Sequence, residues 1–227
     1  MPEPFGVEIA PDQKVTAIAY PAGTRDRAGV TLVLGHGAGA GQTSGFMVSF
    51  ATALAARGID TVTFNFLYTE QGRRLPDSKG KLEACYRAVI VAVGQRKNGR
   101  DRLAIGGKSM GGRIASQVAA GGAPEVAGLV FLGYPLHPPG KPDQLRVKHL
   151  PDIQAPMLFV QGARDTLGTP EELRPVIKTL KAPAELYAVA GGDHSFKVLK
   201  RAGVTQEDTY KAALDRIDQW LRATLTI

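Results

Sequence analysis

A serine, an aspartate and a histidine at three separate points of this chain could act together as nucleophile, orienting acid and base. Ser109 lies in residues 107–111, which read GKSMG and match the pattern GxSxG. In that pattern the serine occupies a strained strand-to-helix turn that exposes its hydroxyl. Asp165 and His194 follow in chain order, and a serine becomes a good nucleophile when a histidine oriented by a carboxylate takes its proton. We refer to these three residues as the triad, and they predict acyl transfer through a covalent intermediate on Ser109.

The same stretch has two other interpretations. Its letters GKS also end a Walker A phosphate loop, GxxxxGK[ST], but that loop needs a glycine where this chain has Arg102. The apolar run Leu103–Ile105 also continues up to the glycines and leaves no loop to wrap a phosphate. The spacing therefore excludes a phosphate loop, whereas a purely structural glycine-rich strand end stays open as long as GxSxG is considered by itself.

A second glycine-rich stretch could supply hydrogen-bond donors to the developing oxyanion. Residues 35–41 read GHGAGAG and directly follow the apolar run Val30–Leu34. The run lacks the third glycine of the dinucleotide fingerprint GxGxxG, and it resembles the HG-type loop that offers a backbone N–H to an oxyanion. We expect the oxyanion hole to consist of the N–H of Met110 and the N–H of Ala38, with Gly37 as the alternative to Ala38.

The remaining histidines and one further aspartate compete for these roles. We expect the ring of His36 to support the glycine-rich loop, and His149 to lie on the surface. His137 follows the strand next to the Ser109 strand and is a candidate to line the substrate pocket. Asp193 adjoins the triad histidine but should point elsewhere. Taken singly, the triad aspartate could be a turn residue and the triad histidine a surface residue, so the prediction rests on their joint order and positions.

Apolar strand-like runs alternate with helical periodicity along the chain. The predicted strands are Phe5–Ala10, Val15–Ala19, Val30–Leu34, Thr61–Phe66, the run from Leu103 to the glycines, Val126–Tyr134, Pro156–Gly162 and Ala184–Val189. The predicted helices are Phe46–Arg57, one containing Cys85, one from Ser109 to about Ala120, one capped by Thr169 with Pro170 and Glu172, and an amphipathic one capped by Thr205 with Asp208 and carrying Trp220.

This order predicts an α/β fold with a doubly wound, mostly parallel sheet and helices on both faces, in a single domain over residues 1–227. The first two strands, Phe5–Ala10 and Val15–Ala19, are expected as a pair at the sheet edge. Residues 67–80 are expected as a long surface loop. The loop of about 19 residues from Pro135 is too short for a helical lid, so the site should be open to water.

Three motifs carry a resemblance to a known family. GKSMGGR at the Ser109 turn, YPLH at 134–137 with PPGK and LR after it, and DHS at 193–195 resemble the α/β-hydrolase family of testis-expressed protein 30. The same domain occurs in subunit 3 of the NSL chromatin complex, and dienelactone hydrolases are more distantly similar. The resemblance covers about residues 30–196 and implies the α/β-hydrolase fold. Because dienelactone hydrolases proper carry a cysteine where this chain has Ser109, their substrate is not implied.

The positive charge is concentrated in one segment. The chain has a net charge of +7, and residues 70–113 hold eleven Lys and Arg against four Asp and Glu, which accounts for all of the excess. Such a segment could steer an anionic substrate or an acidic partner, or could simply be solvated surface charge. Only one aromatic residue, Tyr86, lies among the basic ones, which argues against single-stranded nucleic acid. Lys108, Arg113 and Arg146 are candidates to favour substrates with a carboxylate.

Targeting and redox signals are sparse. The start of the chain has no signal-like segment, and no run of about 18 apolar residues predicts a membrane span. The single cysteine, Cys85, is expected in the core, and a cytoplasmic location is expected. We therefore predict a carboxylesterase-like serine hydrolase acting on a small acyl substrate, without metal or cofactor. The alternative from a different class is a non-catalytic module that binds an acidic partner through residues 70–113.

Overall fold

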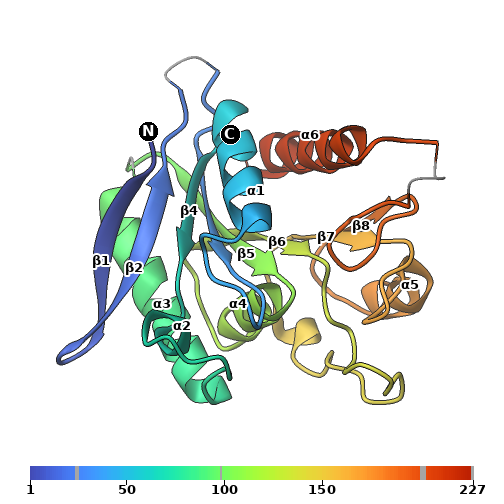
Figure 1. Ribbon diagram of the computed structural model, residues 1–227, viewed down its shortest axis with the longest axis horizontal. Coiled ribbons are helices and arrows are strands. Elements are labelled where there is room, and N and C mark those ends of the chain that lie inside the picture. Colours follow the sequence, from blue (N-terminus) through green and yellow to red (C-terminus); the bar gives the residue numbers. More distant parts are fainter. Residues whose placement is uncertain (24–25, 98, 200–202, 226–227) are drawn as a thin grey trace.

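A sheet of eight strands in the order β1-β2-β4-β3-β5-β6-β7-β8 forms the centre of the molecule (Figure 1). The computed structural model describes residues 1–23, 26–97, 99–199 and 203–225. The strands are β1 Glu3–Ala10, β2 Gln13–Tyr20, β3 Val30–Gly35, β4 Asp60–Phe64, β5 Arg102–Lys108, β6 Val126–Leu132, β7 Met157–Gly162 and β8 Ala184–Val189. All neighbours from β4 to β8 pair in parallel, whereas β2 runs antiparallel to both β1 and β4. The predicted mostly parallel, doubly wound sheet is confirmed.

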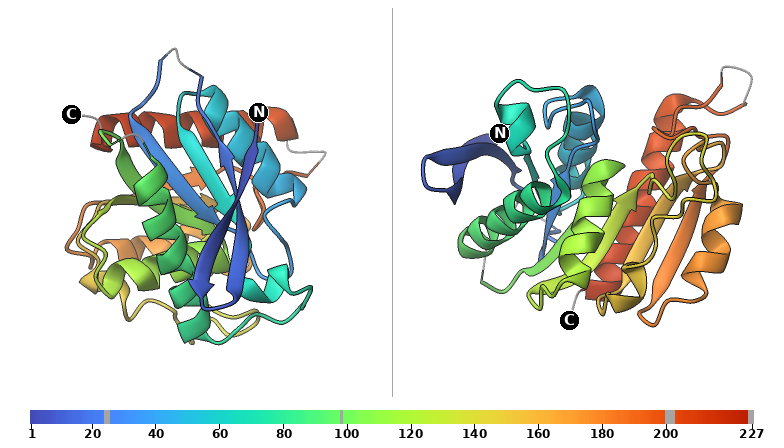
Figure 2. Two further views of the ribbon diagram at one scale, coloured as in Figure 1. Left: turned by 90° about the vertical axis from the view of Figure 1, so that its left-hand side faces the viewer. Right: turned by 90° about the horizontal axis from the view of Figure 1, so that it is seen from below.

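Helices cover both faces of this sheet (Figure 2). One face carries α1 Gly45–Ala56 and α6 Gln206–Leu225, and the other carries α3 Lys79–Arg96, α4 Met110–Ala120 and α5 Pro170–Ile177. Phe50 and Trp220 belong to the core on the first face, and Ile114 and Leu173 to the core on the second. Because both faces are buried, the central strands read as continuous apolar runs instead of alternating ones.

The prediction that the first two strands both lie at the sheet edge is correct for one strand and wrong for the other. The strand β1 lies at the edge, but β2 is bonded on both sides, because Ala17 pairs with Phe64 of β4 as well as with Phe5 of β1. Val15 and Ala17 are accordingly buried. The weak alternation in the sequence identified the hairpin but not its second neighbour, because pairing with β4 depends on contacts nearly fifty residues away along the chain.

The segments that follow β4 and β6 also differ from expectation. Within the predicted loop 67–80 the structure has a short helix, α2 Leu67–Glu70. The strand β6 ends two residues before the predicted Tyr134, because Gly133 turns the chain with φ 68° and the N–H of Tyr134 donates to the Gln161 side chain. Between β6 and β7 the structure has a single 3-10 turn, η1 Leu150–Asp152, so this segment forms no helical lid, as predicted.

Candidate active site

Ser109 sits on a strained turn between β5 and α4. Its backbone has φ 51° and ψ −114°, a region that L-residues with a side chain rarely occupy and that is typical of functional sites. The flanking glycines are required by contact: a Cβ on Gly107 or on Gly111 would overlap the carbonyl oxygen of Gly35 on β3. The strained turn that GxSxG predicts is therefore present, and the glycines allow β3 and α4 to approach it closely.

The triad aspartate and histidine meet in the loops after β7 and β8. His194 Nδ1 lies 2.7 Å from Asp165 Oδ2, and the carboxylate is 1% exposed. Its other oxygen accepts the backbone N–H of Leu167 at 2.8 Å, and Gln161 Nε2 donates to Oδ2 at 2.8 Å. A carboxylate accepts only, so Nδ1 donates the proton and Nε2 keeps its lone pair for a proton from elsewhere.

Lys108 connects the histidine loop to the serine turn. Its Nζ donates to the carbonyl oxygen of His194 at 2.6 Å, and Lys108 is the residue directly before Ser109. Among the described residues, Ser109 Oγ forms no hydrogen bond with the His194 ring. The serine turn and the loop that carries His194 are thus linked by the hydrogen bond to the main chain of His194.

The position of the Lys108 side chain contradicts one prediction from the sequence. Lys108 was a candidate to favour a substrate carboxylate, but its side chain is buried beneath the His194 loop and does not line the pocket at Ser109. Burial lowers the pKa of its ammonium group to about 8, against the opposing effect of Asp165 and Asp193. Among the described residues its ammonium group donates one hydrogen bond, to a backbone carbonyl oxygen of the protein, so Lys108 serves the loop and not an external anion.

The glycine-rich loop after β3 is held by His36. The ring is fully buried, its Nε2 accepts the backbone N–H of Phe66 at 3.2 Å, and its Nδ1 lies 2.8 Å from the carbonyl oxygen of Gly37. Because Nε2 accepts, Nδ1 carries the proton, and burial lowers the pKa of this ring. His36 supports the loop backbone, as expected from the sequence.

A pocket of about 280 Å³ opens beside Ser109. It brings together the two expected oxyanion donors, Ala38 and Met110, with the serine. Met110 is the first residue of α4, so its N–H has no partner within the helix. The remaining lining residues come from the segment before α3, from α3 and α4, and from the loops after β6 and β7: Pro76, Asp77, Lys79, Leu82, Arg113, Pro135, Arg146 and Leu167.

Neither His137 nor His149 lines this pocket. His137 is buried, with Nδ1 2.9 Å from the carbonyl oxygen of Pro138 and Nε2 3.5 Å from Glu172. Its place in the sequence makes it a candidate to line the pocket, but it is not one of the lining residues. The prediction of a surface His149 is wrong: it is half-buried against α4, with Nε2 2.7 Å from Ser116 Oγ. Burial, followed by the positive charge of Arg113, lowers its pKa to about 4.

Two polar residues hold the triad loops from outside the pocket. Asp193 points away from the His194 ring, as expected, and its Oδ1 accepts the N–H groups of Ser195 at 2.7 Å and Lys197 at 2.9 Å. Gln161 was missed by the sequence reasoning, although it is the single polar side chain in the otherwise apolar strand MLFVQG. Besides Asp165, its amide reaches the carbonyl oxygen of Gly168 at 2.6 Å.

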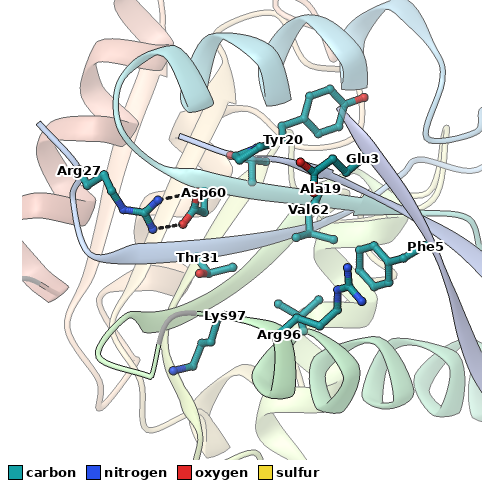
Figure 3. A pocket seen from close by; sticks show the side chains of 13 residues that line it. Glu3, Phe5, Ala19, Tyr20, Arg27, Thr31, Asp60, Val62, Arg96 and Lys97 are labelled. Atoms are coloured by element: carbon teal, nitrogen blue, oxygen red, sulfur yellow. Dashed lines mark hydrogen bonds and ion pairs between the residues drawn. The ribbon is translucent and has the colours of Figure 1, made fainter. Parts of the chain in front are cut away.

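A cavity of about 500 Å³ lies elsewhere, between the β1–β2 hairpin, the start of β4 and the end of α3 (Figure 3). It contains the ion pair of Arg27 with Asp60, and Arg96 lies 4.2 Å from the ring centroid of Phe5. None of the predicted site residues lines it. Thr31 and Asp60 lie at the amino ends of their strands, whereas Ser109 follows the carboxyl end of β5, so the two cavities are at opposite ends of the sheet.

Within the described residues, no three or more His, Cys, Asp and Glu side chains are arranged to hold a metal ion. The helices in this part of the chain are also too short or too polar to cross a lipid bilayer.

Comparison with known proteins identifies the family of this chain. The profile of a family described as an α/β-hydrolase domain matches residues 28–222. The chain belongs to this α/β-hydrolase family.

Solved structures share the fold over nearly the whole chain. An α/β serine hydrolase homologue from Coxiella burnetii is 20% identical, covering 99% of this chain and 97% of that one, with a TM-score of 0.72. A serine hydrolase from Xanthomonas campestris, described as having no lid, is 20% identical over 99% and 93%, with the same TM-score of 0.72. A dienelactone hydrolase from Anabaena variabilis is 18% identical over 98% and 96%, with a TM-score of 0.72. The distant similarity to dienelactone hydrolases expected from the sequence is thus confirmed for the fold.

Proposed function

We propose that this protein is a carboxylesterase-like serine hydrolase that cleaves small esters or related acyl compounds through an acyl-enzyme on Ser109. The observation that carries the proposal is the 2.7 Å contact between His194 and the buried carboxylate of Asp165, in loops fastened to the strained serine turn. A histidine oriented in this way presents Nε2 as a base, which is the group that a serine nucleophile requires.

In the proposed reaction Ser109 Oγ attacks the carbonyl carbon of the substrate while His194 Nε2 takes the hydroxyl proton. Asp165 stabilises the imidazolium that forms, and the N–H groups of Ala38 and Met110 donate to the oxyanion. Each such donor contributes about 3 kcal/mol to the stability of the transition state. When the tetrahedral intermediate collapses, His194 gives the proton to the leaving alcohol, and water then releases the acyl group by the same route in reverse.

A narrower membership is part of this proposal. The motifs GKSMGGR, YPLH and DHS support a place in the family of testis-expressed protein 30 within the α/β-hydrolases. The non-catalytic module that binds an acidic partner has the weaker support, because Asp165 faces His194 instead of turning away from it. The cytoplasmic location stays a prediction.

Labelling with a fluorophosphonate probe, followed by mass spectrometry, tests the hydrolase proposal. We expect an adduct on Ser109 in the parent, no adduct in Ser109→Ala, and an unchanged adduct in Ser49→Ala. Ser49 is exposed on α1 and provides the same chemical change outside the site. A folded parent without an adduct on Ser109 would refute the proposal and make the interaction module the leading reading.

A further inference from the structure

We propose that the pocket beside Ser109 takes short esters that carry a carboxylate group, and that Arg113 and Arg146 bind this carboxylate. The inference rests on the proposed hydrolase function and adds the class of substrate. It also narrows the broader expectation from sequence, because only two of the three basic candidates line the pocket.

Backbone hydrogen bonds fix the positions of both arginines. Arg113 lies on α4, and its N–H donates to the carbonyl oxygen of Ser109 at 3.1 Å, so it is one helical turn from the proposed nucleophile. Arg146 lies in the loop after β6, where its N–H donates to Leu136 at 2.7 Å and its carbonyl oxygen accepts the hydroxyl of Tyr134 at 2.8 Å. The two side chains therefore come from anchored positions on different elements.

Within the part of the chain that the structure describes, neither guanidinium group has an anionic partner. Neither forms an ion pair among the described residues, and Nε of Arg113 is buried without a hydrogen-bond acceptor. The acidic residue of the lining, Asp77, is already bound to Arg73 at 2.7 Å. The side chain of Arg113 thus keeps hydrogen-bond donors that no acceptor among the described residues satisfies.

The charges of these arginines act on each other. Both side chains are half-buried, and the pKa of Arg146 is lowered by its burial and then by the charge of Arg113. Two cations that repel each other in a partly desolvated pocket are unfavourable until an anion lies between or beside them. Guanidinium groups bind carboxylates in a fork of two parallel hydrogen bonds, so a substrate carboxylate fits this pair.

The size of the pocket limits the substrate. Its volume of about 280 Å³ is at the lower end of the range for small-molecule sites and also includes the space at Ser109. A carboxylate held by the arginines can therefore be only a few bonds from the ester carbonyl at Ser109. Short esters with a carboxylate on the acyl chain or on the leaving group fit both conditions.

Two matched substrate pairs test the proposal. The first pair is the p-nitrophenyl monoester of adipic acid and its neutral methyl ester, and the second is 4-acetoxybenzoate and its methyl ester. For each pair the charge preference is the ratio of kcat/KM for the anionic to the neutral ester. Measurement in about 0.5 M salt removes steering by the net positive charge of the protein, because screening then acts within a few ångströms.

We expect the preference in at least one pair to fall about tenfold in Arg113→Gln and in Arg146→Gln, the loss typical of a charge-assisted hydrogen bond. Arg174→Gln is the matched control. Arg174 is exposed on α5 and lies outside the pocket, and its replacement changes the net charge by the same amount. The preference should be unchanged in this control. If a glutamine variant fails to fold, Arg146→Lys, which keeps the charge and loses the fork, should reduce the preference by less than tenfold but measurably.

Separate outcomes refute the inference and the function. Parent-like preferences in all the pocket variants, with Ser109 labelled by the fluorophosphonate and the neutral esters hydrolysed, would overturn the inference alone. A folded parent that neither hydrolyses any of the four esters nor reacts with the probe would overturn the proposed function, and the inference with it.

Discussion

Gln161 is the residue whose replacement should separate loop support from chemistry. The side chain is fully buried, and its amide group makes hydrogen bonds with three residues of the loops after β6 and β7. Oε1 accepts the N–H of Tyr134 at 2.8 Å, while Nε2 donates to the carbonyl oxygen of Gly168 at 2.6 Å and to Asp165 Oδ2 at 2.8 Å. The variant Gln161→Met keeps the length of the side chain and leaves these three buried groups each without one partner.

The structure sets the size of the expected effect. A buried polar group that loses its partner costs about 1–3 kcal/mol, so three such groups at the low end give about 3 kcal/mol. With a urea m-value of about 2–3 kcal/mol/M, the unfolding midpoint of Gln161→Met should fall by about 1 M or more. Because Asp165 also loses a bond that orients it, kcat should fall about tenfold with a smaller change in KM.

Urea unfolding followed by circular dichroism, together with ester hydrolysis, measures both effects. Gln154→Met is the matched control, because Gln154 is exposed and its amide forms a single hydrogen bond among the described residues, to the carbonyl oxygen of Asp152 at 3.1 Å. Its midpoint should shift by less than about 0.3 M. Equal midpoints for Gln161→Met and Gln154→Met would show that the Gln161 bonds do not stabilise the loops, and the reasoning would be refuted.

Two further predictions concern groups outside the pocket. The pKa of His149 is lowered from 6.5 to about 4, so between these values the unfolded state binds a proton that the folded state does not, and stability should fall as the pH falls from 6.5 to 4. Discounted for its partial exposure, the His149 contribution to this loss is about 1 kcal/mol, so the parent should lose about that much more stability than His149→Asn when urea unfolding is compared at pH 7 and pH 4.5; an equal loss in the two proteins would contradict it. Burial raises the pKa of the Cys85 thiol to about 12, so iodoacetamide at pH 8 should alkylate the native protein at least about 1000-fold more slowly than the urea-unfolded chain, as measured by mass spectrometry. Comparable native and unfolded rates would show that the thiol is accessible.

The parts of the fold that the sequence predicted well are those that local chemistry specifies. Continuous apolar runs identified the central strands, because parallel strands buried on both faces tolerate few polar residues. GxSxG identified the strained turn at Ser109, because only glycine fits where Gly107 and Gly111 approach Gly35. The capping box at Thr169 likewise formed as predicted, since its two hydrogen bonds lie within one helical turn.

Predictions about where a side chain points were less successful. The sequence placed Lys108 and Arg113 together as candidates for a substrate carboxylate, yet Lys108 lies beneath the His194 loop and Arg113 lines the pocket. His149 was assigned to the surface because its partner, Ser116, is on a helix 33 residues earlier. The residues next to Lys108 and His149 in the sequence do not indicate these contacts.

The sequence by itself determined the order of the strands and helices along the chain, the strained serine turn, and the chain order Ser, Asp, His. These follow from the periodicity of apolar residues and from the steric freedom of glycine, which act over a few neighbouring residues. The tertiary structure alone decided that Gln161 would hold Asp165, that Lys108 would bind the loop of His194, and that Arg113 and Arg146 would share a pocket. These contacts join ends of different strands and loops, and their distances depend on how the whole sheet and its connections pack.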